Sequence, residues 1–295
     1  MQNSRVVGLA LAGWLGGTAL AMAAGADQFG KNGIIVDTAY VEAALKRDAI
    51  VLDVRAPAAY ERGHIPGAVS LDIGTTRDSK TEDYIPLDQV AKILGDAGLD
   101  PNKETIVYAT RGSAGAYFGQ VTLELFGNKK VHVYHGGIDD WTAGGKPIAT
   151  QPTKLAAVSL KASPLPGITL TSAEVMDRLG KPTVQILDAR TVAEHKGEDL
   201  RPGATRGGNI PGSINITYEM NLVEDKAGQS LKSLDALKLL YAKLDPTKET
   251  VVYCQSGVRA SETAAILRDL GFTNVKVYDS SWIGYSAIPT APVNK

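Results

Sequence analysis

Cys254 is the only cysteine of the 295-residue sequence, and its neighbours are those of a reactive site. Residues 250–253 before it are β-branched or aromatic, which predicts a buried strand. After a short turn, residues 260–270 carry apolar side chains at helical spacing. Open α/β sheets bind ligands where a strand leads into a helix, and the turn N–H groups and helix N-terminus stabilise a thiolate there. We therefore predict that Cys254 is a nucleophile and not a buried packing residue.

Arg259 follows the cysteine with four residues between them. These residues form a turn whose N–H groups are expected to point at a bound anion. They are Gln255, Ser256, Gly257 and Val258. Cysteine-dependent tyrosine phosphatases carry one residue more between the same two side chains, so the shorter ring is expected to hold one extra sulfur atom in preference to a tetrahedral phosphate. A phosphatase stays open as an alternative.

An internal repeat divides the chain into two copies. VLDVR at 51–55 recurs as ILDAR at 186–190, HIPGAVSL at 64–71 as NIPGSINI at 209–216, and DPNKETIVYA at 100–109 as DPTKETVVYC at 245–254. The offset grows from 135 to 145 residues, so the second copy carries about ten more residues between Glu194 and Ile210. Two copies are too few for a solenoid and predict a pair of similar domains.

The first copy lacks the reactive residues of the second. Ala109 stands at the position of Cys254, and no arginine stands at the position of Arg259. Arg111 and His64 have no nucleophile to assist, and we interpret them as structural. The first copy is therefore predicted to be a scaffold.

Composition and pattern predict the fold class and the domain bounds. The 295 residues, 44% of them hydrophobic, are enough for two domains. Predicted strands at 49–54, 105–108 and 130–134 alternate with predicted helices at 87–99 and 119–126, which indicates α/β domains with parallel sheets. We place the first domain at 34–148, a proline-rich linker at 149–168 and the second domain at 169–290.

Two local expectations concern the linker and the start of the second domain. The short run at 155–160 is expected to add an edge strand. Residues 171–179 are expected to form a helix, with Thr171 and Glu174 as its capping box.

The charge balance excludes several partner classes. A net charge of −1 leaves no basic excess for nucleic acid or an anionic membrane. The four histidines are scattered, and no cysteine and histidine spacing indicates zinc, so we expect neither a metal nor an organic cofactor.

Residues 1–26 have the pattern of a signal peptide. Arg5 precedes an uncharged stretch, and Ala24 and Ala26 fit a cleavage site before Asp27. We expect export to a bacterial periplasm and no membrane contact after cleavage, with a retained anchor helix as the alternative. A single cysteine can form no internal disulfide there.

The loop CQSGVRAS at 254–261 resembles the active-site loop of the rhodanese family of sulfurtransferases, and the repeat is similar to its tandem form. The resemblance implies two rhodanese-like domains, each a parallel sheet flanked by helices, with an inactive first copy closing one side of a cleft. It implies that Cys254 carries sulfur as a persulfide and that Arg190, Arg259 and the loop residues bind a small anionic donor. The acceptor would be cyanide or a small or protein thiol, and the protein is expected to be a monomer.

The identity of the sulfur donor is inferred from the charged side chains near the loop. Mercaptopyruvate sulfurtransferases carry a threonine in the loop and a second arginine after the one matched by Arg190, whereas this sequence has Glu194 nearby. Glu194 would repel a carboxylate, and Arg259 would attract the sulfonate end of thiosulfate, so we expect thiosulfate to be the better donor. A mercaptopyruvate enzyme and a persulfide carrier for a partner protein remain alternatives.

Arg190 has an architectural alternative, a structural ion pair. Arg55 stands at the same position in the copy without a nucleophile, which favours this alternative in part. Asn209 replaces the histidine usual in the family's HIPG turn, and no catalytic cost is expected from it.

Overall fold

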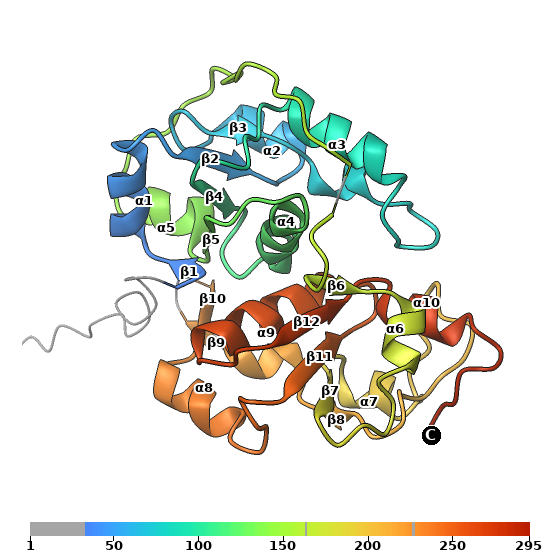
Figure 1. The fold of residues 1–295 in the computed structure, drawn as a ribbon. Coiled ribbons are helices and arrows are strands. Elements are labelled where there is room, and N and C mark those ends of the chain that lie inside the picture. Colours follow the sequence, from blue (N-terminus) through green and yellow to red (C-terminus); the bar gives the residue numbers. More distant parts are fainter. Residues whose placement is uncertain (1–32, 163, 226–227) are drawn as a thin grey trace, which may run out of the picture.

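The computed structural model describes residues 33–162, 164–225 and 228–295, which form two α/β domains (Figure 1). The predicted signal peptide lies outside the described residues. Each domain contains one five-stranded sheet whose strands are all parallel. The prediction of an α/β fold with two parallel sheets is confirmed.

The first sheet has the strand order β1-β5-β4-β2-β3. Its strands are β1 (Ile35–Val36), β2 (Ile50–Asp53), β3 (Val69–Ser70), β4 (Thr105–Tyr108) and β5 (Val131–Tyr134). Its helices are α1 (Thr38–Leu45), α2 (Pro57–Arg62), the 3₁₀ helix η1 (Ile73–Thr76), α3 (Leu87–Asp96), α4 (Ala114–Leu125) and α5 (Gly137–Ala143). The central strands are buried along their whole length, as expected for strands covered on both faces.

The second sheet repeats this order as β6-β12-β11-β7-β8. Its strands are β6 (Thr169–Leu170), β7 (Val184–Asp188), β8 (Ile214–Asn215), β11 (Glu249–Tyr253) and β12 (Val275–Tyr278). Its helices are α6 (Ser172–Met176), α7 (Val192–His195), the 3₁₀ helix η2 (Tyr218–Asn221), α8 (Leu234–Leu240), α9 (Val258–Asp269) and α10 (Ser281–Ser286). The sequence repeat is thus a repeat of topology.

The local expectations have mixed outcomes. The capping box of Thr171 and Glu174 is present at the start of α6, which ends earlier than predicted. The edge strand expected at 155–160 is wrong, since this segment forms no strand. Val158 N instead donates to Gly95 O at the end of α3. The segment packs against a helix end there, and one backbone bond to a helix carbonyl does not make a sheet ladder.

Helices α4 and α9 join the two domains face to face (Figure 1). The guanidinium of Arg268 on α9 donates to Glu124 on α4 at 2.6 Å. The carboxylate of Asp269 accepts the backbone N–H groups of Ile34 and Ile35 at 2.8 and 3.0 Å. These bonds hold β1 and α4 of the first domain against α9.

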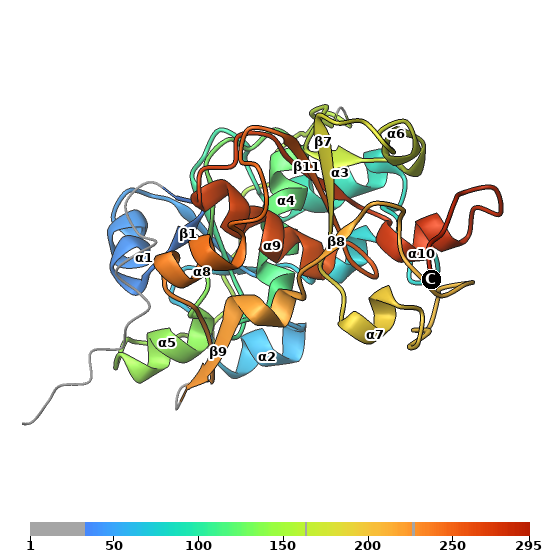
Figure 2. The same cartoon turned by 90° about the horizontal axis from the view of Figure 1, so that it is seen from below.

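An antiparallel hairpin of β9 (Leu222–Asp225) and β10 (Gly228–Leu231) crosses from the second domain to the first (Figures 1 and 2). Gln229 O lies 3.3 Å from His135 Nε2, and Arg111 Nη1 donates to Ser230 Oγ at 2.7 Å. The hairpin therefore covers the loop that begins at Ala109. Within the described ranges, no helix has the length and hydropathy needed to cross a membrane.

Candidate active site

Cys254 lies directly after β11, and α9 begins four residues later at Val258. Its side chain is buried, with 1% of its surface exposed. Gly257 turns the chain into the helix with a φ of +84°. A Cβ at this position would lie 2.5 Å from Asp279 O, so both the backbone angle and the contact require glycine. The predicted arrangement of strand, turn and helix is therefore present.

The segment after β12 holds the loop backbone in place. Cys254 N donates to Ser281 Oγ at 3.1 Å, and Cys254 O accepts from Trp282 N at 3.0 Å. Gln255 O accepts from Ile283 N at 3.1 Å. Ser281 itself has a φ of +49°, which is unusual for a residue other than glycine. Sequence reasoning missed Ser281, because a lone serine after a strand has no recognisable pattern.

The loop keeps backbone donors for a ligand. Among the described residues, no protein acceptor bonds the N–H groups of Gln255, Ser256, Gly257 or Val258. Together with the N-terminus of α9 they favour negative charge beside Cys254. The side chain of Gln255 turns away and donates to Pro202 O at 3.1 Å. The groups that the loop presents to a bound anion are therefore mainly its backbone N–H groups.

The charge of Arg259 is paired with a carboxylate, and its role in donor binding stays a prediction. Its Nη1 and Nη2 donate to the two carboxylate oxygens of Glu194 at 2.8 and 2.7 Å. Burial works against the charged guanidinium, but the hydrogen bonds to Glu194 and the charge of the nearby Cys254 outweigh it and raise the pKa of Arg259. The charge argument for the donor is thus corrected: Glu194 neutralises Arg259, because the two side chains meet across the loop.

The side chain of Arg190 is enclosed by its own domain. Its Nη2 donates to Asp188 Oδ2 at 2.7 Å and to Gly208 O at 2.8 Å, and its guanidinium carbon lies 4.4 Å from the Trp282 ring centroid. Arg190 is 1% exposed. Although burial opposes ionisation of Asp188, hydrogen bonds from His195 and Arg190 hold the pKa of this carboxyl below its usual value.

The first domain contains the same arrangement around Arg55. Its Nη2 donates to Asp53, and also to Gly63 O at 2.8 Å. Its guanidinium carbon lies 5.8 Å from the Tyr108 ring centroid, as that of Arg190 lies 5.3 Å from the Tyr253 ring centroid, whereas the Trp282 contact has no counterpart in the described part of the first domain. A contact set that recurs in a domain without a nucleophile is architectural. The contacts of Arg190 therefore fit the structural alternative, while its donor-binding role stays a prediction.

The comparisons with known proteins agree with this geometry. The family model described as "Rhodanese-like domain" matches residues 37–144 and 171–288, which together exceed half of the chain. The chain belongs to the rhodanese-like domain family. Both matches fall on the two sheets described above, so this rhodanese has two such domains, and the prediction of a rhodanese-like transferase is confirmed.

Two of the relatives carry the name of a thiosulfate sulfurtransferase. A Mycobacterium bovis protein with the provisional name thiosulfate sulfurtransferase 1 is 34% identical over 80% of this chain and 87% of its own length. The thiosulfate sulfurtransferase of Corynebacterium glutamicum is 31% identical over 79% of this chain and 80% of its own.

Solved structures share the rhodanese fold at lower identity. The anaerobic ergothioneine biosynthesis enzyme of Chlorobium limicola, in complex with trimethyl histidine, superimposes with a TM-score of 0.80 at 22% identity. The match covers 89% of this chain and 70% of that one. The wild-type structure of EanB gives a TM-score of 0.78 at 21% identity, with 89% and 69% covered. At this identity the likeness establishes the fold alone.

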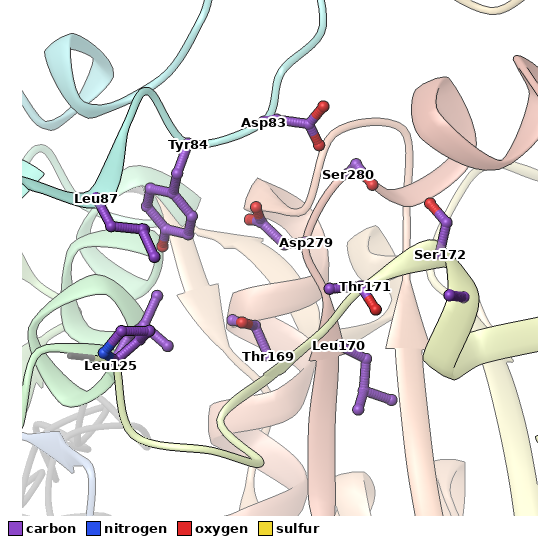
Figure 3. A pocket seen from close by; sticks show the side chains of 12 residues that line it. Asp83, Tyr84, Leu87, Leu125, Thr169, Leu170, Thr171, Ser172, Asp279 and Ser280 are labelled. Atoms are coloured by element: carbon purple, nitrogen blue, oxygen red, sulfur yellow. The ribbon is translucent and has the colours of Figure 1, made fainter. Parts of the chain in front are cut away.

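A cavity of about 480 Å³ lies between the two rhodanese domains (Figure 3). Asp83, Tyr84 and Leu87 line it from the first domain. Thr171 and Asp279 line it from the second. Asp279 also touches the loop, because its carbonyl oxygen lies against Gly257. In the described part of the chain, no group of three or more His, Cys, Asp or Glu side chains is placed to hold a metal ion.

Proposed function

We propose that this protein is a sulfurtransferase that moves sulfane sulfur from thiosulfate to cyanide or a thiol through a persulfide on Cys254. The observation that carries the proposal is the loop itself: one cysteine at a strand end, with four backbone N–H groups that bond no described protein acceptor. Such groups stabilise a thiolate and then a persulfide anion without any cofactor.

The reaction is a double displacement. The Cys254 thiolate attacks the outer sulfur of thiosulfate, the sulfur–sulfur bond of the donor breaks, and sulfite leaves with the bonding electron pair. Cys254 then carries one extra sulfur atom as a persulfide anion. Cyanide attacks that outer sulfur, thiocyanate leaves, and the thiolate is restored, so the cycle needs no external oxidant or reductant.

The choice of thiosulfate rests on the names of the relatives, since Arg259 and Glu194 cancel each other's charge. Mercaptopyruvate remains the alternative donor, and a persulfide carrier for a partner thiol remains the alternative role. A steady-state comparison of the two donors at equal concentration tests the choice. We expect a kcat/KM at least about tenfold higher for thiosulfate, or roughly 1.4 kcal/mol of transition-state preference. Faster turnover of mercaptopyruvate would reverse the assignment.

The test of the proposed chemistry is thiocyanate formation by wild-type protein and by Cys254→Ser. The wild-type protein should form thiocyanate and gain the mass of one sulfur atom after thiosulfate alone. The variant should do neither while keeping its circular dichroism spectrum. Appreciable thiocyanate from the folded variant would refute the nucleophile. A stable mass gain without multiple turnovers would favour the carrier role.

We also propose that the protein is exported to the periplasm, cleaved before Asp27 and monomeric. The support is the sequence pattern of residues 1–26. Amino-terminal sequencing of protein from the native host tests the cleavage, and an intact Met1 on cytoplasmic protein would exclude it. Light scattering on the purified mature chain tests the monomer.

A further inference from the structure

Arg77 of the first domain reaches the reactive loop of the second. It follows η1, and its side chain is only 5% exposed. Its Nη1 donates to Asp279 Oδ1 at 3.0 Å. The same nitrogen lies 3.5 Å from the place that a Cβ on Gly257 would occupy. A guanidinium from the domain without a nucleophile thus lies against the turn that begins at Cys254.

The internal repeat shows that this cation is specific to the reactive loop. The position of Arg77 in the second copy is Leu222, which is buried in the hydrophobic core. Over the unreactive loop, a Cβ on Gly112 would meet the side chain of Gln229 at 2.8 Å. Each domain therefore covers the loop of the other, with the neutral Gln229 over the loop that lacks a cysteine and Arg77 over the loop that has one.

Arg77 differs from the two arginines that the sequence singled out. Arg190 and Arg259 each donate two hydrogen bonds to one carboxylate. Arg77 makes one good hydrogen bond, to Asp279. Its Nε lies 3.6 Å from Glu82 Oε2, an ion-pair distance too long for a hydrogen bond, and among the described residues this buried nitrogen has no hydrogen-bond partner. Its guanidinium carbon lies 4.7 Å from the Phe118 ring centroid, which holds the planar group in place. Arg77 keeps donors that a second acceptor can use.

Asp279 is a weak partner for this arginine. The pKa of Asp279 is raised to about 6, chiefly by burial and in part by the neighbouring Asp83 and Glu82, and Arg77 only partly opposes this rise. Asp83 of the first domain and Asp279 of the second both line the cavity between the domains (Figure 3). An anion that enters beside the loop therefore competes with a carboxylate that is already disfavoured.

We propose that Arg77 binds the anionic end of the sulfur donor and so makes the first domain part of the donor site. This inference rests on the proposed sulfurtransferase function. The donor oxyanion takes the Nε and Nη hydrogen bonds while its outer sulfur faces Cys254, and Asp279 restrains Arg77 when the site is empty. The competing explanation is a simple ion pair that ties the two domains together.

Three variants with opposite expectations separate these explanations. Arg77→Gln removes the cation and should raise KM for thiosulfate by about tenfold, because a charge-assisted contact is lost. Asp279→Asn keeps the shape, frees Arg77 and should lower KM by about threefold. Arg268→Gln, the matched control, breaks the other ion pair across the interface, to Glu124, and should leave KM unchanged.

A pure interface role gives a different pattern. All three variants would then lower the melting temperature, and their KM values would either change together or stay at the wild-type value. A KM for Asp279→Asn at or above the wild-type value would overturn the proposal. Lowering the pH from 7 to 5 should reduce KM in the wild type but not in Asp279→Asn, since Asp279 loses its charge near Arg77, Glu82, Asp83 and Tyr84. Failure of the proposed function is distinguishable, because the wild-type protein would then form no thiocyanate.

Discussion

Arg259 and Glu194, which are 65 residues apart in sequence, form a two-point ion pair across the reactive loop at 2.7 and 2.8 Å. The side chain of Glu194 is 1% exposed and that of Arg259 is 20% exposed, so the pair is largely removed from water. Glu194 also accepts from Thr191 as part of the cap of α7. The pair therefore fixes α7 to the start of α9 and leaves little net charge for the donor.

Arg259→Ala should destabilise the protein by roughly 2–4 kcal/mol, because it leaves the carboxylate of Glu194 buried without its partner. The double variant Arg259→Ala/Glu194→Ala should recover part of that loss. Urea unfolding of both single variants and the double variant measures the coupling as a double-mutant cycle. A coupling near zero would mean that the pair does not form in solution.

Arg190→Lys should lower the stability of the second domain by roughly 2–4 kcal/mol, since the single ammonium group of lysine cannot replace the planar guanidinium that donates to both Asp188 and Gly208 O. Arg55→Lys is the matched control and should weaken the first domain in the same way. Arg55→Lys should keep the wild-type KM for thiosulfate within about twofold. The predicted donor-binding role of Arg190 requires a rise in KM that is confined to Arg190→Lys, and an unchanged KM in that variant would leave Arg190 with the structural role alone.

Glu262 on α9 should make stability fall as the pH rises. Both of its carboxylate oxygens are buried without a hydrogen-bond partner among the described residues. Burial raises its pKa from 4.5 to about 8, so the folded state holds this proton more tightly than the unfolded chain does. The free energy of unfolding should therefore fall as the pH rises from 4.5 to about 8, by up to about 1.4 kcal/mol for each unit by which the pKa is raised.

Unfolding free energies at several pH values test this expectation. Glu262→Gln should be more stable than the wild type at pH 8 and should show a flatter pH profile. The exposed Glu219→Gln is the control and should keep the wild-type slope. An unchanged slope in Glu262→Gln would mean that the carboxyl reaches a partner or solvent.

The four-residue ring between Cys254 and Arg259 should not support phosphatase activity. The charge of its arginine is also balanced by the carboxylate of Glu194. Small aryl phosphates should show no turnover above that of Cys254→Ser. Turnover that depends on Cys254 would contradict this expectation.

The sequence alone determined the repeated α/β fold, the reactive copy and the position of Cys254 at a strand end. These features are local or repeated: hydrophobic runs define the strands, and glycine at 257 allows the turn. The capping box of Thr171 and Glu174 was predictable for the same reason, because the residues that form it are three apart in sequence.

Only the tertiary structure decided which charges are free. Glu194 was expected to act on the donor, but it bonds Arg259, since the fold brings α7 to the start of α9. For Arg190 the sequence allowed both donor binding and a structural ion pair, and only the structure shows that its guanidinium donates to Asp188 and Gly208 O. Arg77 had no motif, because its significance comes from Gly257 and Asp279 in the other domain. Coulomb interactions depend on distance and burial, and the packing of two domains sets both.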